Sequence, residues 1–247
     1  MYRILVLVYG VVSYVVFFLT FLYAIGFVGN IYVSKTIDSG VAGPFWQALL
    51  VNVLLLGIFA IQHSVMARPG FKAWWTKIIP ASIERSTYVL LTNGALILMY
   101  WKWQPMTDVV WNVDGGAFGT VLIVLFWFGW ALVLLSTFMI NHFDLFGLRQ
   151  VYLNLKRKPY TDLKFTTAFA YKFIRHPLLL GFIIAFWAAP VMTTGHLLFA
   201  AVTTVYMLIA IRLEEKDMVD AFGETYQMYR REVPMLIPTG RRSSSSE

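Results

Sequence analysis

The sequence of 247 residues contains no cysteine and few charged residues. Without cysteine the chain can form no disulfide, no thiolate metal site and no cysteine nucleophile. Only 13% of its residues are charged, whereas 59% are hydrophobic, and the mean hydropathy is +0.67. A water-soluble domain of this length could not bury so much apolar surface. The composition therefore predicts an integral membrane protein.

Common nucleotide-binding and metal-binding motifs are also missing. The chain contains neither a Gly-x-Gly-x-x-Gly motif nor a phosphate-binding loop, so any nucleotide-containing ligand binds without a Rossmann or P-loop unit. His63 and His142 each lie near the end of an apolar run and are the candidate ligands of a metal or haem. No carboxylate lies three or four residues from a histidine, however, and we predict no metal site.

Six long apolar runs occur along the chain and predict its helices. The runs are Ile4–Val28, Phe45–Ile61, Tyr88–Tyr100, Ala117–Ile140, Leu178–Val191 and Leu197–Ile211. The last two are short and share a turn of small residues, which favours a hairpin of tilted helices over two upright spans. The expected fold is therefore an all-α integral membrane bundle of five to six transmembrane helices.

Charge is distributed unevenly over the loops. The segment 67–86 carries four basic residues against one acidic residue, and 141–177 carries seven against two, whereas 104–116 carries only two acidic residues. Because positive loops stay in the cytoplasm, we expect both termini in the cytoplasm of a multi-pass protein of the inner or plasma membrane. The same rule accounts for the net charge of +7, so nucleic acid is not expected as a partner.

Two polar clusters lie at the ends of the second and third apolar runs. Gln62-His63-Ser64, with Arg68, closes the second helix, and Glu84-Arg85 opens the third. Helix capping alone also explains each cluster, and it is the favoured explanation for Glu84-Arg85, because a histidine suits a helix C-terminus and an acidic residue suits a first turn. Ionisable residues at the ends of membrane helices are nevertheless candidate functional residues.

The segment 141–150 interleaves six polar or glycine positions with four large apolar ones. This pattern is typical of a segment that lies at the membrane interface with its polar atoms turned inward. His142 and Asp144 are two residues apart and cannot share one helical face, so we expect one of them just past the helix end.

The sequence Arg175-His176-Pro177, followed by Gly181, opens a hydrophobic helix. Proline suits the first helical position, and the unpaired N–H groups there, together with the two cationic side chains, can receive an anion such as a carboxylate. Gly181 permits the close approach of another backbone or of a flat ring.

Two adjacent carboxylates, Glu214 and Glu215, follow the last apolar run. They are explained either by a solvated helix face with local ion pairs or by a cationic or hydroxyl-rich ligand at the membrane edge.

The order R-H-P-x-x-x-G, E-E, F-G-x-x-Y-x-x-Y and V-P-x-x-I-P within residues 145–238 resembles the isoprenylcysteine carboxyl methyltransferase superfamily. These are integral membrane enzymes that use S-adenosylmethionine. One departure is Leu179, where the superfamily commonly has tyrosine. The segments 62–72, 84–90 and 141–150 extend the resemblance to the bacterial methanethiol S-methyltransferases, which implies methylation of methanethiol to dimethyl sulfide.

This resemblance implies roles for the candidate residues. Arg175 and His176 would hold the methionyl carboxylate, Glu214 or Glu215 the ribose or ammonium, and Tyr226 and Tyr229 would flank the adenine. The remaining residues assigned to the cofactor are Gln150, Tyr171, Pro177 and Gly181. The substrate-side roles come from the polar clusters themselves and not from the resemblance: His142 would act as the base, polarised by Asp144, and Arg149 and His63 would stabilise the thiolate. The substrate cluster also includes Arg68, Glu84 and Arg85.

The predicted organisation has three parts. Residues 1–140 form a transmembrane bundle, 141–238 the methyltransferase core with a cytoplasmic cofactor face capped by its C-terminal helical segment, and 239–247 a disordered tail. Methanethiol and membrane lipid are the expected partners, and the oligomeric state is left open. The alternatives are a prenylcysteine carboxylate or phospholipid acceptor, a nicotinamide-dependent reductase, and a non-catalytic haem or channel protein of the denitrification-associated type.

Overall fold

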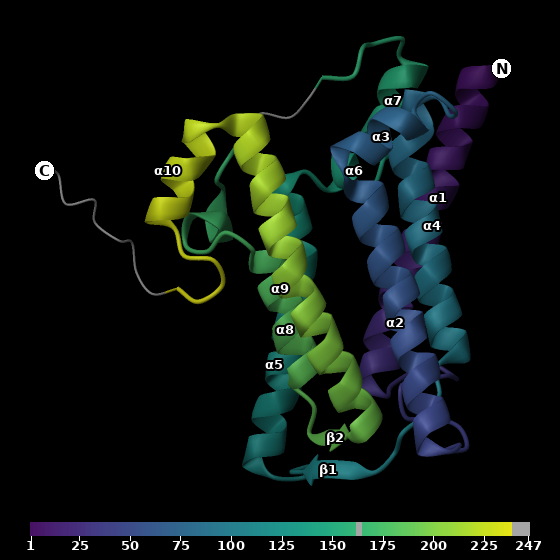
Figure 1. The fold of residues 1–247 in the computed structure, drawn as a ribbon, viewed down its shortest axis with the longest axis vertical. Helices are drawn as coiled ribbons and strands as arrows, with labels where there is room; N and C mark the ends of the chain where they lie inside the picture. Colours follow the sequence, from purple (N-terminus) through teal and green to yellow (C-terminus); the bar gives the residue numbers. More distant parts are fainter. Residues whose placement is uncertain (162–164, 239–247) are drawn as a thin grey trace, which may run out of the picture. The chain divides into compact units, whose positions relative to one another are not determined.

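The computed structural model describes residues 1–161 and 165–238 and is almost entirely helical (Figure 1). The predicted disordered tail at 239–247 lies outside the described residues. The helices are α1 (Tyr2–Gly29), α2 (Phe45–Ala67), α3 (Pro69–Trp75), α4 (Ala81–Lys102), α5 (Ala117–Ile140), α6 (His142–Leu145), α7 (Leu148–Leu155), the 3₁₀ helix η1 (Phe169–Lys172), α8 (Pro177–Trp187), α9 (Thr194–Phe222) and α10 (Glu224–Glu232). Two short strands are β1 (Val109–Asn112) and β2 (Val191–Thr193).

The predicted all-α membrane fold is confirmed. Within the described residues, four helices are long and apolar enough to cross a membrane, namely α1, α2, α5 and α9. The two remaining apolar runs lie in α4, which has 22 residues but includes charged ones, and in α8, which has 11. At 1.5 Å per residue α8 extends about 16 Å, roughly half the thickness of a bilayer's hydrocarbon core. The protein is therefore multi-pass, with α8 as a short apolar helix.

Several helix ends follow directly from local sequence. Asn30 adopts the left-handed conformation (φ 55°) and closes α1 through a hydrogen bond from its N–H to the carbonyl of Gly26. Pro69 and Pro177 occupy the first positions of α3 and α8, where a missing N–H costs no hydrogen bond. Glu84 lies in the first turn of α4, where the helix dipole favours an acidic residue. The predictions for Pro177 and Glu84 are thus confirmed.

The chain divides into two compact units. Unit 1 comprises Met1–Asn112, His142–Asp162 and Val191–Phe199, and unit 2 comprises Val113–Asn141, Leu163–Pro190 and Ala200–Glu247. This grouping follows packing alone, and the functional division at residue 140 stays a prediction.

In unit 1, α4 packs against both α1 and α2, and α7 packs against α1 and α4 (Figure 1). β1 pairs with β2 in antiparallel register, with Val109 opposite Thr193. Aromatic side chains fill the packed interior, and Tyr23 stacks on Tyr100 with ring centroids 5.4 Å apart. The α1–α4–α7 packing brings the start of α4 and the segment after α5 together.

In unit 2, α5 and α8 pack along each other through facing glycines. A Cβ atom on Gly181 would lie 2.8 Å from the carbonyl oxygen of Gly129, and one on Gly129 would lie 2.7 Å from the carbonyl oxygen of Gly181. Small residues at such a contact let two membrane helices approach closely. The approaching group expected at Gly181 is therefore the backbone of α5.

The last long helix is longer than its apolar run. The sequence favoured a hairpin of two short tilted helices over the last two apolar runs. α8 is short, but α9 has 29 residues and continues to Phe222, so Glu214 and Glu215, which follow the apolar run, lie inside it. The expected length of the second helix was wrong, because hydropathy shows where the apolar run ends and not where the helix ends. Glutamate and lysine keep a high helix propensity, so the helix persists beyond the run.

Candidate functional site

The polar segment that follows α5 folds into a tight turn in unit 1. α5 ends at Ile140, and the single turn of α6 carries both His142 and Asp144, which are 3% and 7% exposed. We expected only one of the two just past the helix end, but both lie there. The turn closes at Gly147, whose φ of 88° and close approach to the backbone of Ser86 both require glycine.

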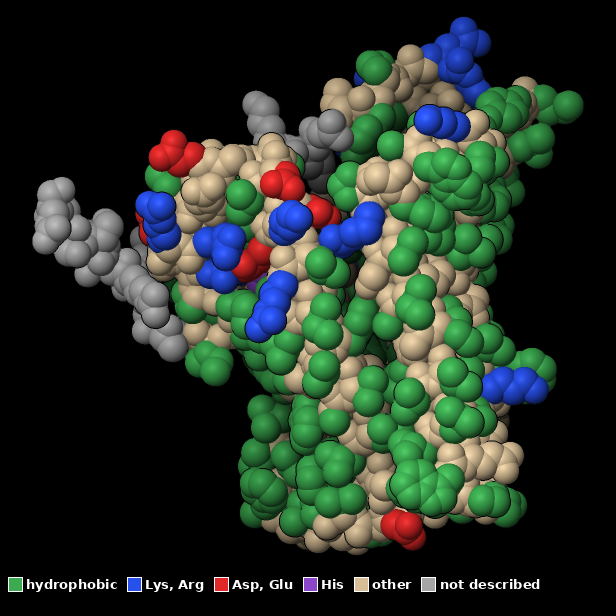
Figure 2. All heavy atoms as spheres, viewed as in Figure 1, with side chains coloured by type: hydrophobic (Ala, Val, Ile, Leu, Met, Phe, Trp, Pro, Cys, Tyr) green, Lys and Arg blue, Asp and Glu red, His purple; other side chains and the backbone are tan. Residues whose placement is uncertain are grey.

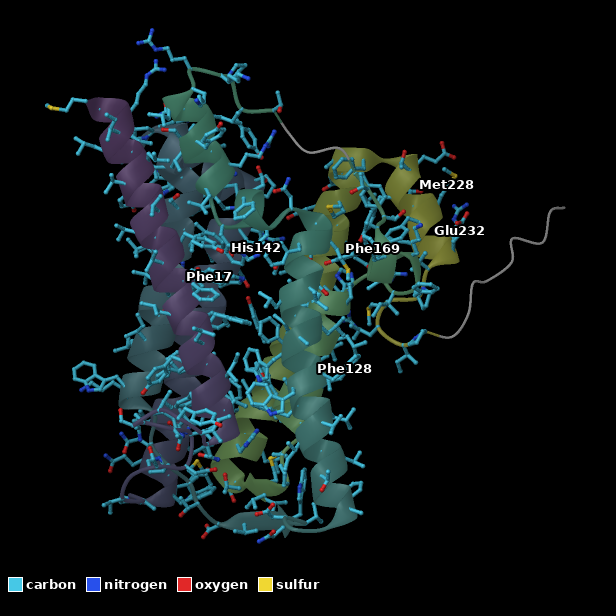
Figure 3. All side chains as sticks on the ribbon, turned by 180° about the vertical axis from the view of Figure 1, so that it is seen from behind. Phe17, Phe128, His142, Phe169, Met228 and Glu232 are labelled. Carbon is cyan, nitrogen blue, oxygen red and sulfur yellow. The ribbon has the colours of Figure 1, made fainter. Side chains whose placement is uncertain are left out.

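His142 lies among aromatic side chains. Its Nε2 is 2.8 Å from the hydroxyl oxygen of Tyr14 in α1. The ring also meets Phe17 and Phe146 edge-on, at centroid distances of 6.4 and 4.9 Å, and Figure 3 shows Phe17 beside His142. Burial lowers the pKa of His142, so the neutral imidazole, which can accept a proton, predominates at neutral pH.

Asp144 lies at the centre of a hydrogen-bond network. Its carboxylate accepts hydrogen bonds from Nη1 of Arg149 at 2.9 Å and from the hydroxyl of Tyr160 at 3.3 Å. Arg149 also donates to the carbonyl and hydroxyl oxygens of Thr161, and its hydrogen bond to Asp144 raises the pKa of its guanidinium. Gln150 donates to the backbone carbonyl of Asp144. The network ties the segment after α7 to the His142 turn.

The cluster at the end of α2 converges on a tyrosine. The hydroxyl of Tyr88 lies 2.9 Å from Nδ1 of His63, and the guanidinium of Arg85 lies 5.5 Å from the centre of the Tyr88 ring. Arg68 donates from Nε to the carbonyl of Ser64 in the last turn of α2. His63 and Arg85 are thus brought together as a group, through a residue that the sequence did not single out.

In unit 2, the carboxylate of Glu215 is almost fully buried and receives several donors. Nε of Arg175 donates at 2.6 Å and Nε2 of His176 lies at 3.1 Å from the same oxygen, while Nε of Arg230 forms an ion pair with the other oxygen at 3.1 Å. Figure 2 shows acidic and basic side chains gathered over α10 and the neighbouring end of α9. Arg175 and His176 are therefore close to a carboxylate, as predicted for a ligand, but this carboxylate belongs to the protein.

The segment after α10 pairs with the start of α8 through the backbone. The N–H of Arg175 donates to the carbonyl of Pro234 at 2.9 Å, and that of His176 donates to the carbonyl of Met235 at 3.2 Å. Nη1 of Arg175 further donates to the carbonyls of Arg230 and Val233. The motif V-P-x-x-I-P thus closes the unit by presenting carbonyl acceptors to the R-H-P segment.

Glu214 differs sharply from its neighbour. Its side chain is 57% exposed and lies 3.7 Å from Nδ1 of His176. An aromatic group lies in the same unit, where Phe165 contacts the rings of Tyr226 and Tyr229 at centroid distances of 5.5 and 5.3 Å. Burial raises the pKa of both phenols, that of Tyr229 to about 12, so they stay neutral at physiological pH.

Tyr229 also positions Tyr171, because its hydroxyl donates to the Tyr171 carbonyl at 2.6 Å. The structure thus gathers the predicted cofactor residues other than Gln150 within unit 2, whereas Gln150 belongs to unit 1. Sequence reasoning missed Tyr14, Tyr88 and Arg230. Tyr14 lies inside a continuous apolar run, where nothing in the sequence distinguishes it from other membrane-facing aromatics.

Across residues 1–161 and 165–238, no group of three acidic or histidine side chains is arranged to hold a metal ion.

Comparison with curated proteins finds relatives over nearly the whole chain. The chain is 56% identical over 242 residues to the methanethiol S-methyltransferase of Mycobacterium tuberculosis, covering 98% of this chain and 99% of that protein. It is 55% identical to the methanethiol S-methyltransferase of Crocosphaera subtropica, over 98% and 95% of the two chains. It is 51% identical to methanethiol S-methyltransferase 1 of Bradyrhizobium diazoefficiens, over 97% and 84%. The chain belongs to the methanethiol S-methyltransferase family. No protein-family model and no solved structure match it.

Membership of the methanethiol S-methyltransferase family confirms the resemblance read from the segments 62–72, 84–90 and 141–150. The roles of individual site residues stay predictions.

In this member of the methanethiol S-methyltransferase family, Gly181→Leu is expected to separate α5 from α8. Any side chain there meets the backbone of Gly129, and such overpacking typically costs about 1–3 kcal/mol of folding free energy. The measurement is thermal unfolding in detergent, with Gly57→Leu as control, because a side chain at Gly57 meets nothing within 4 Å. Wild-type stability of Gly181→Leu with lost cofactor binding would instead assign Gly181 to the cofactor site.

Proposed function

We propose that this protein transfers a methyl group from S-adenosylmethionine to methanethiol, giving dimethyl sulfide and S-adenosylhomocysteine. The observation that carries the proposal is the 56% identity over 98% of the chain to a protein named methanethiol S-methyltransferase. It favours a small thiol over a prenylcysteine, a phospholipid, a nicotinamide-dependent reduction or a non-catalytic role.

The residues of unit 2 fit S-adenosylmethionine by their chemistry. The exposed carboxylate of Glu214 suits the ammonium group or the ribose hydroxyls, and the half-buried Tyr229 offers an aromatic face for adenine. Tyr226 is buried and packs against Tyr229 and Phe165, so its part is to support the Tyr229 ring. In the described contacts of Arg175, Nε and Nη1 donate hydrogen bonds to groups of the protein itself. We propose that Nη2 donates to the methionyl carboxylate. The start of α8 adds the positive end of its helix dipole to this anion site.

When bound, S-adenosylmethionine supplies a methyl group already activated by its sulfonium, and this methyl passes to the thiol sulfur. The protein then has to align the partners and remove the thiol proton, because the thiolate is the nucleophile and a small thiol has a pKa well above 7.

We propose that Tyr14 and His142 together remove the thiol proton. His142 is buried, whereas Tyr14 is partly exposed, and the two are joined by a 2.8 Å hydrogen bond. The Tyr14 oxygen takes the thiol proton as its own proton passes to Nε2 of His142, leaving a thiolate, a neutral phenol and an imidazolium. Asp144 then stabilises the imidazolium, and the aromatic surroundings of His142 exclude water.

We further propose that both termini and the loops around 67–86 and 141–177 face the cytoplasm of an inner or plasma membrane. The uneven loop charge supports this orientation. Reporter fusions at 156–158 test it, and an external reporter signal at this site would overturn it.

The proposed reaction is tested with purified protein, S-adenosylmethionine carrying a deuterated methyl group, and a panel of acceptors in closed vials. We expect dimethyl sulfide with one deuterated methyl group in the headspace when methanethiol is present. Ethanethiol, a farnesylcysteine analogue and phosphatidylethanolamine represent the alternatives. Labelled product from the last two but none from methanethiol would contradict the proposal.

A further inference from the structure

A pocket of about 520 Å³ opens in unit 1 among α3, the start of α4, α7 and the segment that follows α7. No step of the proposed methyl transfer uses it. Its polar lining consists mainly of Lys72, Glu84, Arg85, Gln150, Asn154 and Lys158.

The pocket carries an excess of positive charge. Lys72, Arg85 and Lys158 face one carboxylate, that of Glu84, and they come from three different segments. Ala81 also lines the pocket, so the first turn of α4 adds the positive end of its helix dipole. Convergent cations beside a helix N-terminus are suited to a phosphate.

Three buried polar atoms of residues that line the pocket have no hydrogen-bond partner among the described residues. They are Nδ2 of Asn154, Oε1 of Glu84 and Oε1 of Gln150. Buried polar atoms are nearly always paired, so these three atoms point to a ligand. The amide of Asn154 can donate to a phosphate oxygen, and the two acceptor oxygens require a ligand that also carries O–H or N–H donors.

The surface beside the pocket is apolar. Trp74 is 51% exposed and Ile78 is 59% exposed, and both lie close in sequence to Lys72. Figure 2 shows basic side chains at the end of unit 1 that holds α3 and α7, and apolar side chains over much of the face away from that end. Tryptophan beside lysine is typical of a segment at the headgroup level of a bilayer. The ligand therefore has apolar chains as well as a phosphate.

We propose that this pocket binds the headgroup of a phospholipid that combines a phosphodiester with hydroxyl donors, as phosphatidylglycerol does. The lysines and Arg85 hold the phosphate with Asn154, and the glycerol hydroxyls donate to Glu84 and Gln150. The site holds a structural lipid and is independent of the proposed reaction.

The test is native mass spectrometry of the full chain in detergent with phosphatidylglycerol, phosphatidylcholine and inorganic phosphate. Phosphatidylglycerol should bind about tenfold or more tightly than phosphatidylcholine, whose headgroup has a phosphodiester but no hydrogen-bond donor. Lys72→Ala with Lys158→Ala should weaken phosphatidylglycerol binding about 30-fold, or about fivefold for each lysine. Asn154→Asp, which keeps the shape but reverses the polarity, should also weaken it about tenfold.

The matched control is Lys77→Ala with Lys156→Ala, which removes the same charge from neighbouring positions outside the pocket lining. It should change lipid affinity less than about twofold. Equal losses in the two double variants would reduce the effect to diffuse surface charge and overturn the proposal. Displacement of the lipid by inorganic phosphate would make the ligand a free phosphate, and equal affinity for the two lipids would remove the role of Glu84 and Gln150.

Discussion

His142→Ala is expected to lower the rate of methanethiol methylation about 10²–10⁴-fold while leaving the affinity for S-adenosylmethionine near its wild-type value. The imidazole is the proposed final acceptor of the thiol proton, and it lies in unit 1, whereas the proposed cofactor ligands lie in unit 2. Raising the pH should partly restore the rate, because solution then supplies thiolate. Headspace kinetics and calorimetry measure the two quantities.

Tyr14→Phe should reproduce much of this loss if the hydroxyl relays the proton. Tyr9→Phe is the control, because the Tyr9 hydroxyl contacts Thr87 in the same unit without meeting His142. Since burial lowers the pKa of His142, the base form persists below the ordinary histidine value of about 6.5, and the wild-type rate should fall only at still lower pH. Wild-type rates for both His142→Ala and Tyr14→Phe would move the proposed acceptor site to the group around His63 and Arg85.

Glu215→Ala is expected to lower the free energy of unfolding by about 3–5 kcal/mol. Removing one partner of a buried ion pair leaves the other charge uncompensated, and the Arg175 side chain is only 10% exposed. The loss is measured by thermal unfolding of the purified protein in detergent. Glu215→Gln, which keeps an acceptor oxygen without the charge, should lie between alanine and wild type.

The adjacent carboxylate supplies the control. Glu214→Ala should unfold like the wild type, because its side chain is 57% exposed, but should bind S-adenosylmethionine about tenfold more weakly. The opposite pattern, with a stable Glu215→Ala protein that fails to bind the cofactor, would make Glu215 the ligand and Glu214 a surface residue.

The features that sequence reasoning found share a local cause. The helix start at Pro177 and the acidic first turn at Glu84 depend on neighbouring residues alone, and the alternation of polar and apolar residues in segment 141–150 is visible in the sequence itself. Hydropathy likewise predicted the long helices, because a sufficiently long apolar run is stable as a helix across the bilayer.

What the sequence did not reveal depends on contacts between distant segments. Arg175 and Glu215 are 40 positions apart, and each by itself suggests a ligand contact because a lone charge at a membrane edge needs a partner. Only the fold shows that Arg175 and Glu215 form an ion pair with each other. Tyr14 and His142 are 128 positions apart. Nothing in the sequence marks a tyrosine within an apolar helix as functional until its hydrogen-bond partner is known. The length of α9 was underestimated because polarity does not end a helix.

The partners of Glu215 are synthesised at different times. Arg175 and His176 precede it in the chain, so they can meet the carboxylate as soon as α9 forms, whereas Arg230 follows it by fifteen residues. Chains fold from the N-terminus as they are made, so the backbone pairing of Pro234 and Met235 with the start of α8 is among the last contacts to form. A nascent chain that stops before α10 therefore carries its membrane helices and the first ion pair but lacks the segment that pairs with the start of α8.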